Sequence, residues 1–576
     1  MKFINRILAI ALIGLFVSAC DKIDENLNNP TEVTPEGAQV DDVYNSVQLS
    51  MRNLMSNMWY WPASLTRMTA NTSSYDYATA SNPNSFNGIW NTTYSGMWAD
   101  IDVVIALAEN IGLDIHAGSA KIMKAYSMML LVDVFGDIPY SEALQGIGVI
   151  APTADPGADV YAAATALLQE AIAQMAGTSS ASPANDNFYA GDAAKWTTLA
   201  NTLLLRAAIT TRLVDGSAGS TITSVVNGGD FIDSASEDWQ FNYGTTRENP
   251  NSRHPNYNNS YESGDGAYMS NYYMWMLRAE KLDGGGIPVV DPRIRYYFYR
   301  QTEDASVQDE NTYSCHFSNT PDPASRPSYY ADVDPNMPYC IAYPGDGYWG
   351  RDHLNSEGIP PDGPIRTIYG LYPFGGQFDD NTFEDQQQSG TTGATGAGIW
   401  PMLTSSYVAF MRAEAALTLG TEGGDARPLL ESGMRASFSK VVSFEARDAA
   451  SFSRTVTDRA GNTATIKQLY GASGADVDDY VNFVLAEYDA AASDDERLDI
   501  VMKEYYIALW GNGIEAYNMY RRTGKPGNMQ PGLETSPGPF MKSFFYPADH
   551  EQRNPNVVQK QVTDPVFWDN GSANVY

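Results

Sequence analysis

Apolar residues recur at gaps of three and four positions along two long parts of the chain. Two clear runs are Tyr161, Ala164, Leu168, Ile172 and Met175, and Trp196, Ala200, Leu203, Ala207 and Thr210. This spacing gathers apolar side chains on one face of a helix, where they can pack against a neighbouring helix. The pattern therefore predicts a mainly α fold built from paired helices.

The predicted helices form two groups along the sequence. In the first group, Thr34 can cap a helix that has Pro35 in its first turn, and the pattern continues to about Met58. Beyond the two runs above, helices are predicted over residues 88–111, 118–135, 404–419, 426–440, 475–491 and 494–521. Antiparallel pairs of this kind resemble tetratricopeptide units, although the sequence shows no clean repeat of about 34 residues.

The middle of the chain has a different composition. Residues 215–400 are rich in glycine, proline, asparagine, aspartate and tyrosine and carry few long helical patterns. Irregular stretches of this length in a compact protein are more often functional than incidental. We expect one domain over 34–576, in which a helical frame (about 34–214 and 401–525) brackets a loop-rich, ligand-binding insert and precedes a Pro/Gly-rich tail.

The N-terminus reads as an export signal. Lys2 and Arg6 precede an apolar run over residues 7–17, about half the ~20 residues that a membrane-spanning helix needs. Val17-Ser18-Ala19-Cys20 has the form of a bacterial lipobox, in which Cys20 is lipidated and becomes the first mature residue. The prediction is a signal peptide over 1–19, lipid on Cys20 and a polar tether over 20–33, which anchors the protein to a membrane. The alternative is an ordinary secretory signal with an incidental cysteine.

Net charge and aromatic content indicate which partners to expect. The chain has a formal net charge of −33 and no basic run with interleaved aromatics, so nucleic acid is not an expected partner. The 36 tyrosines and 11 tryptophans offer flat apolar faces with a polar edge, which suit sugar rings or peptide side chains. Most of these rings are still expected in the core; Trp90, Tyr94 and Trp98, for example, share one predicted helix face.

Cysteine and histidine usage predicts no metal site and no cofactor. The five histidines are scattered, and Cys315 and Cys340 are the only cysteines beyond Cys20. In an exported protein this pair is predicted to form a disulfide, with two separately buried cysteines as the alternative. The acids Asp332 and Asp334, and likewise Asp476, Asp478 and Asp479, read as solvated loop charges or weak structural calcium ligands rather than a catalytic pair.

Six segments resemble one family in its order along the chain. They are AKIMKAYSMMLLVDVFGDIPYSEAL, GDAAKWTTLANTLLLRAAITTRL, DPRIRYYF, PMLTSSYVAFMRAEAALTLG, KEYYIALWGNGIEAYNMYRRTGKPG and FYPADHEQRNP. Within the first, Gly136 suits the left-handed residue that stops a helix and Pro139 prevents its resumption. With the lipobox, these segments resemble the SusD/RagB-like nutrient-binding outer-membrane lipoproteins, and most closely the SusD-like type 2 branch.

The resemblance implies a function that charge and periodicity do not reveal. It implies a lipoprotein on the outer face of the outer membrane that captures an oligosaccharide, or sometimes a peptide, without breaking bonds. The protein would close over a SusC-like TonB-dependent barrel and hand the ligand on. A surface glycoside hydrolase and a helical-repeat structural adaptor remain the alternatives.

Ligand-binding residues are predicted from segment position alone. Relatives bind through loops before the second helix and in the middle insert, which here contain RMTANTSSYDYATASN, NYYMWMLRAE and GDGYWGRDHLNSEG. The predicted stacking and contact residues are Asn71, Tyr75, Tyr77, Trp275, Tyr348 and Trp349, and the predicted hydrogen-bonding residues are Arg67, Asp76, Arg351 and Asp352. For each of them the alternative is a structural role in its loop.

Overall fold

The computed structural model describes residues 39–264, 266–303, 326–340, 346–348, 350–356, 366–384, 389–573 and 575. Helices dominate these residues, and the strands in them form three two-stranded sheets. In the described part of the chain, no helix has the length and apolar character required to cross a bilayer.

The N-terminal helices form one end of the molecule. The long ones are α2 (Val40–Asn57), α6 (Trp98–Ile111), α7 (Asp114–Phe135), α8 (Gly157–Met175), α9 (Ala193–Thr211) and α10 (Ala218–Gly228). The short ones are α3 (Tyr60–Leu65), α4 (Tyr77–Ala80), η2 (Pro83–Phe86), α5 (Asn87–Thr92), η3 (Thr93–Met97) and η4 (Gly146–Gly148).

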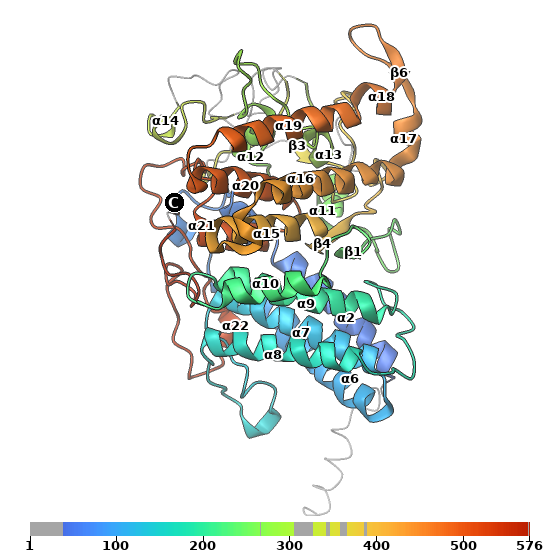
Figure 1. The fold of residues 1–576 in the computed structure, drawn as a ribbon, viewed down its shortest axis with the longest axis vertical. Helices are drawn as coiled ribbons and strands as arrows, with labels where there is room; N and C mark the ends of the chain where they lie inside the picture. Colours follow the sequence, from blue (N-terminus) through green and yellow to red (C-terminus); the bar gives the residue numbers. More distant parts are fainter. Residues whose placement is uncertain are drawn as a thin grey trace, which may run out of the picture.

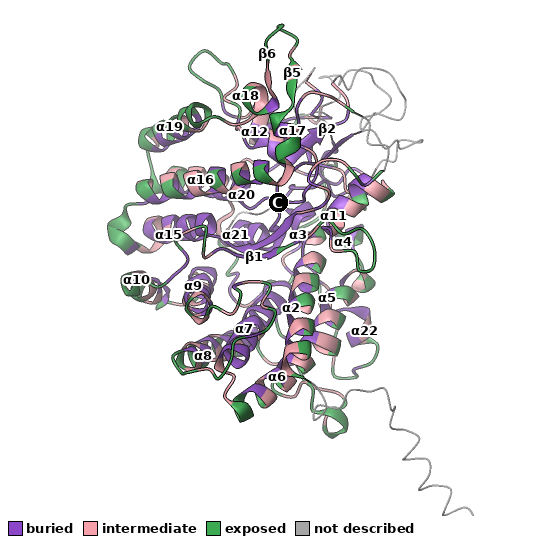
Figure 2. Ribbon diagram, turned by 90° about the vertical axis from the view of Figure 1, so that its right-hand side faces the viewer, coloured by how far each residue is buried: buried purple, intermediate pink, exposed green. Residues whose placement is uncertain are grey.

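The C-terminal helices extend the same stack. They are α15 (Ser405–Leu419), η8 (Thr421–Gly424), α16 (Arg427–Val442), η9 (Ser443–Asp448), α17 (Ala449–Ser453), α18 (Ile466–Tyr470), α19 (Gly474–Ala490), α20 (Asp494–Ala508) and α21 (Gly513–Thr523). The short helix α22 (Ala548–Glu551) instead returns to the N-terminal helices and contacts η2 and α5. Figures 1 and 2 show successive layers from α6 and α8, through α9 and α15, to α19. Paired helices contact their neighbours in the order α7 on α8, α8 on α9 and α15 on α16, so the predicted helix-pair frame is confirmed.

The middle of the chain packs beside this stack as loops and short elements. They are β1 (Trp239–Asn242), α11 (Pro255–Asn258), η5 (Asn259–Ser263), α12 (Asn271–Arg278), α13 (Ile294–Tyr297), β2 (Phe298–Arg300), α14 (Tyr330–Val333), β3 (Thr367–Tyr369) and β4 (Ile399–Leu403). Each sheet is an antiparallel pair, β1 with β4, β2 with β3, and β5 (Thr455–Thr457) with β6 (Thr463–Thr465). The helix α10 lies in the helical stack against α9, beyond the boundary expected at residue 214.

A helix predicted near the C-terminus is divided in the structure. The segment 494–521, predicted as one helix, is α20 and α21 separated by a turn. Gly511 in that turn has φ 101°, and a Cβ there would lie 2.6 Å from Pro373 Cγ, so the close approach requires glycine. Asn512 then caps α21 by accepting from the Glu515 backbone N–H. The predicted cap Thr34 and Pro35 lie outside the described residues.

An aromatic core joins the middle elements to the helices. Trp510, at the end of α20, is fully buried, and its ring centroid lies 5.1 Å from Tyr273 of α12 and 5.0 Å from Phe298 of β2. The predicted core residues Trp90, Trp98 and Trp196 are buried as well. Large aromatic contacts of this kind hold α12 and β2 against the helical stack.

A buried ion pair fixes the turn before α13. Arg293 Nη2 lies 2.6 Å from Asp291 Oδ2 and 3.0 Å from Glu504 Oε2 of α20, and its guanidinium lies 4.4 Å from the ring centroid of Phe438 in α16. All four side chains are buried. The helical frame therefore determines where α13 and β2 present their next residues, Arg295 and Arg300.

Candidate functional site

Two of the predicted ligand-binding residues lie in an enclosed polar network. Arg67 is fully buried and donates from Nε to the Gln530 carbonyl at 2.9 Å and from Nη2 to the Tyr77 hydroxyl at 3.1 Å. The Tyr77 hydroxyl also pairs with His353 Nε2 at 2.9 Å. Burial, with Arg67 nearby, holds the pKa of His353 well below its usual value, so this imidazole is neutral. Arg67 and Tyr77 are thus packed in the interior and expose no face to a ligand in this structure.

Asp352 belongs to the same interior. Its Oδ1 accepts from Asn271 Nδ2 at 3.1 Å and from Gln530 Nε2 at 3.0 Å, and its Oδ2 accepts from the Cys340 backbone N–H at 2.9 Å. Burial raises its pKa despite these hydrogen bonds. The neighbouring Arg351 is also buried, with its guanidinium 4.9 Å from the ring centroid of Tyr268.

The other predicted residues divide by exposure. Trp275 and Asn71 are buried, whereas Tyr75 and Asp76 are half-buried. Asp76 caps α4 by accepting from the Thr79 backbone N–H at 2.8 Å. Trp349 and Cys315 lie outside the described residues, so the bridge from Cys315 to the buried Cys340 stays a prediction.

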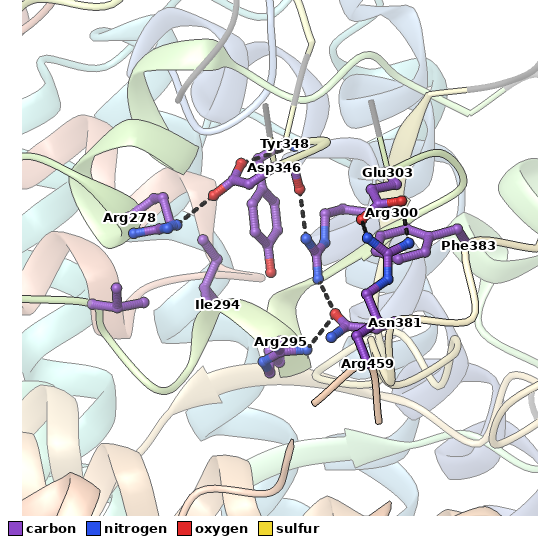
Figure 3. A pocket seen from close by; sticks show the side chains of 11 residues that line it. Arg278, Ile294, Arg295, Arg300, Glu303, Asp346, Tyr348, Asn381, Phe383 and Arg459 are labelled. Carbon is purple, nitrogen blue, oxygen red and sulfur yellow. Dashed lines mark hydrogen bonds and ion pairs between the residues drawn. The ribbon is translucent and has the colours of Figure 1, made fainter. Parts of the chain in front are cut away.

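Tyr348 is the one predicted residue that lines an open pocket described here. The pocket has a volume of about 330 Å³ and is shown in Figure 3. We name it the arginine pocket; it is lined by Arg278, Val290, Ile294, Arg295, Arg300, Glu303, Asp346, Tyr348, Asn381, Phe383 and Arg459. Arg278 comes from α12, Arg295 from α13, Arg300 from β2 and Arg459 from the connection between β5 and β6.

Arg300 stands between two aromatic rings at the base of the pocket. Its guanidinium lies 4.4 Å from the ring centroid of Tyr348 and 4.9 Å from that of Phe383. Asp379 holds it by two hydrogen bonds, from Nε at 2.5 Å and from Nη2 at 3.1 Å. The Tyr348 hydroxyl donates to the same carboxylate at 3.0 Å. This arrangement is rigid, because a bidentate arginine–carboxylate pair fixes both planes.

The carboxylates that hold Arg300 and Arg278 ionise differently. Burial opposes the charge on Asp379, but Arg300 and Arg295 outweigh it and lower the pKa of Asp379. Burial raises the pKa of Asp346, although Arg278 donates to it from Nε at 2.5 Å. Asp379 is therefore a fixed anion under the pocket, whereas Asp346 gains a proton more readily.

Arg295 connects the arginine pocket to a second one. Its Nη1 donates to the Asp379 carbonyl at 2.8 Å and to Asn381 Oδ1 at 3.0 Å. Val290, Ile294 and Arg295 also line an adjoining pocket of about 330 Å³, in which the guanidinium lies 5.1 Å from the ring centroid of Tyr470. Two pockets with a shared wall give room for more than one unit of an extended ligand.

The backbone of one pocket wall is in an uncommon conformation. Asn381 and Phe383 have φ values of 63° and 53°, in the left-handed region. Asparagine tolerates this region, but a bulky residue such as phenylalanine seldom adopts it. Strained positions of this kind concentrate at functional sites, which directs attention to this wall.

Of the residues that line the arginine pocket, the sequence prediction includes Tyr348 but none of the four arginines. Arg295 lies inside DPRIRYYF and Arg300 two residues after it, a segment selected only for its Asp-Pro-Arg turn. No local pattern links Arg300 to Asp379, which is 79 positions away along the chain. The positive-φ wall likewise carries no glycine that would have marked it.

The comparisons with known proteins agree with this architecture. Residues 29–338 match the family model described as "Starch-binding associating with outer membrane", and residues 376–576 match the model of the SusD and RagB outer membrane lipoproteins. No curated protein sequence matches the chain.

Solved structures share the fold at low sequence identity. A SusD/RagB family protein from Bacteroides thetaiotaomicron superposes with a TM-score of 0.64 at 20% identity, over 93% of this chain and 100% of that one. A chitin-binding SusD homologue from Flavobacterium johnsoniae gives 0.61 at 19% identity, over 93% and 100%. A SusD homologue from Bacteroides fragilis gives 0.63 at 17% identity, over 92% and 99%. Since the first model alone spans more than half of the sequence, the chain belongs to the SusD/RagB-like family, as its segment order had indicated.

Proposed function

We propose that this protein binds an oligosaccharide at the cell surface and delivers it to a SusC-like TonB-dependent transporter in the outer membrane. The observation that carries the glycan-binding part is the pair of adjoining pockets, lined by arginines, an asparagine and aromatic rings. Polar groups convergent on an aromatic-lined hollow are what sugar hydroxyls and ring faces require. The family description as starch-binding and the chitin-binding relative support the same ligand class.

The protein is proposed to bind the glycan and not to cleave it. Hydrolysis requires two carboxyl groups on either side of a glycosidic bond, one of them protonated. The two acids that line the arginine pocket, Glu303 and Asp346, are each engaged by an arginine. A hydrolase nevertheless remains the second candidate, because burial raises the pKa of Asp346, as a general acid requires.

Attachment to the membrane is proposed to occur through lipid on Cys20. The lipobox sequence supports it, and two or more acyl chains on one residue give stable anchoring. We propose that the lipidated chain lies at the outer membrane and faces the exterior, where it can contact both a barrel partner and a polymeric nutrient. The family description as outer membrane lipoproteins supports this location.

Two measurements test the proposal. Wild type and Cys20→Ala are compared by co-purification from detergent-solubilised outer membranes. The wild type should bring down a large barrel protein, and the variant should leave the membrane fraction. Affinity electrophoresis in polysaccharide gels, followed by product analysis, distinguishes a binding protein from a hydrolase. Retention without product supports the binding protein, and formation of product supports the hydrolase. Recovery of the wild type alone, in the soluble fraction, would overturn the delivery role.

A further inference from the structure

The charge of the arginine pocket is opposite to that of the whole chain. The chain has a formal net charge of −33, yet the four arginines that line this pocket outnumber its two lining carboxylates and the Asp379 carboxylate that holds Arg300. A concave site with an excess of one sign of charge raises the local concentration of ligands of the opposite sign. The pocket is therefore a place where an otherwise acidic protein can attract an anion.

The four arginines are not equally engaged. Arg300 is held by Asp379 and Arg278 by Asp346. Arg295 instead donates to two neutral oxygens, the Asp379 carbonyl and Asn381 Oδ1, and the Asp379 carboxylate oxygen stays 3.9 Å away. Its side chain is 28% exposed. Among the arginines that line the pocket, Arg295 is the one with no carboxylate of the described residues at hydrogen-bonding distance.

Arg459 is the second arginine that an incoming anion can reach. It extends from the β5–β6 connection to pair with Glu303, with exposed side-chain fractions of 77% and 38%. Figure 3 shows this pair at the same pocket as Arg295, with Asn381 close by. Exposed ion pairs contribute little, about 0–1 kcal/mol, so a ligand anion can take the place of Glu303 at low cost.

The adjoining pocket disfavours an anionic group. Asp476 and Asp479 line it and are exposed, and Arg295 at the shared wall is its only arginine. These carboxylates repel an anionic group of the ligand, so such a group is disfavoured in the adjoining pocket. An oligomer that spans both pockets is thereby directed to place its anionic unit in the arginine pocket and a neutral unit beside Tyr470.

From this charge pattern we infer that the ligand is an acidic glycan whose anionic group, a uronic acid carboxylate or a sulfate ester, binds between Arg295 and Arg459. Arginine suits this role, because its planar fork donates two parallel hydrogen bonds to a carboxylate or a sulfate. The inference rests on the proposed function and adds the chemical class of the glycan.

The test begins with a panel that does not presuppose the sugar. Affinity electrophoresis compares acidic polysaccharides (polygalacturonate, alginate, carrageenan) with neutral ones (starch, chitin, xylan). Titration calorimetry then uses oligomers of the retained polymer. For a uronic acid, the matched ligand is the same oligomer with methyl-esterified carboxyl groups, which keeps the rings and linkages but removes the charge. Retention of carrageenan alone identifies sulfate, and retention of polygalacturonate or alginate identifies carboxylate.

Substitutions of Arg295 test where the anionic group of the glycan binds. Arg295→Gln should weaken binding of the acidic oligomer about tenfold or more, because hydrogen bonds to charged groups are the strong ones. Arg295→Lys, which keeps the charge but not the fork, should retain part of the affinity. Arg427→Gln is the matched control, since Arg427 is also a partly exposed arginine, 42% exposed and paired with Asp489, and neither residue lines the pocket.

The outcomes test the acidic-glycan inference separately from the proposed function. Salt-sensitive retention of acidic glycans, lost on esterification and weakened by Arg295→Gln but not by Arg427→Gln, supports the inference. Retention of a neutral glycan with equal affinity for wild type and Arg295→Gln overturns the inference and leaves glycan binding intact. Retention of no polysaccharide in the panel overturns the proposed function itself.

Discussion

Asp133 and Arg206 form an ion pair that is completely enclosed by the helical frame. Arg206 Nη2 lies 2.8 Å from Asp133 Oδ2, and both side chains are 0% exposed. The same carboxylate accepts from Asn518 Nδ2 at 2.8 Å, from the Tyr161 hydroxyl at 2.5 Å and from Trp568 Nε1 at 3.0 Å. One side chain of α7 thus joins α8, α9, α21 and the C-terminal tail.

Replacing Asp133 should severely destabilise the fold. Asp133→Ala leaves the buried guanidinium with Glu515 as its remaining acid partner and three neutral donors without an acceptor. Removing one partner of a buried ion pair costs about 3–5 kcal/mol. Urea unfolding followed by tryptophan fluorescence should show this loss in the free energy of unfolding.

Asp489→Ala provides the comparison for that loss. Asp489 also pairs with an arginine, Arg427, but the two side chains are 50% and 42% exposed. Exposed pairs contribute little to stability, so the change should be far smaller than the loss caused by Asp133→Ala. Equal effects of the two substitutions would contradict the role given to burial.

A glycine sets the close approach of α15 and α16. A Cβ on Gly433 would lie 2.9 Å from Phe410 Cε2, closer than a Cβ packs without displacement. Gly433→Ala should therefore lower the free energy of unfolding by about 1–3 kcal/mol through overpacking. In Gly228→Ala, another helical position, the Cβ meets nothing within 4 Å, and the gain in helix propensity should make the change neutral or slightly stabilising. Thermal or urea unfolding of the two variants checks the contrast.

Helices with one buried face were predictable from the sequence, and helices buried all round were less so. The stripe in α8 places this helix within a few residues of its observed bounds, because its buried residues recur on one face. Nearly every residue of α7 is buried, so its first turn carries no alternation and the predicted start at 118 falls inside the helix, which begins at Asp114. The break at Gly511 depends on Pro373, a contact distant in sequence.

The site was less predictable than the frame, for the same physical reason. Tyr77 stands in a polar loop that reads as exposed, yet Arg67 and His353 enclose it in the structure. Arg295 reads as one charge in a turn motif; its exposure to a pocket depends on Asn381 and Asp379, more than eighty positions later. Local patterns indicate which segments are loops, but long-range pairing determines which loop side chains face a cavity.

Acid should weaken the fold in part through His550. This ring stacks on Trp90 at a centroid distance of 4.2 Å, and burial lowers its pKa from the usual 6.5 to about 4. Below pH 6.5 His550 binds a proton in the unfolded chain, whereas in the folded chain it stays neutral until the pH falls to about 4. His550 therefore contributes stability that is fully present above pH 6.5 and is lost as the pH falls toward 4, at about 1.4 kcal/mol per pH unit.

His550→Phe separates this contribution from the rest. The variant keeps an aromatic ring on Trp90 and removes the titrating group. Urea unfolding at several pH values between 7 and 4.5 should show a shallower fall in the free energy of unfolding for the variant than for the wild type. His254 and His353 remain in both proteins, with their pKa values held well below 6.5 by burial, so a residual slope is expected. Identical slopes would mean that His550 is protonated as readily in the folded chain as in the unfolded one.

Removing the charge of Glu303 should strengthen binding of an acidic glycan. Glu303 competes with the ligand anion for Arg459, and a like charge a few ångströms away costs about 1 kcal/mol in water. Glu303→Gln should therefore raise the affinity for the acidic oligomer by up to about fivefold, with less than about 1 kcal/mol change in stability, because the pair is exposed. The esterified oligomer should bind both proteins alike, and Asp489→Asn, which removes an exposed acid that does not line the pocket, should leave the affinity unchanged. A loss of affinity in Glu303→Gln would show instead that the Glu303 carboxylate contributes to binding, and would contradict its competition with the ligand anion for Arg459.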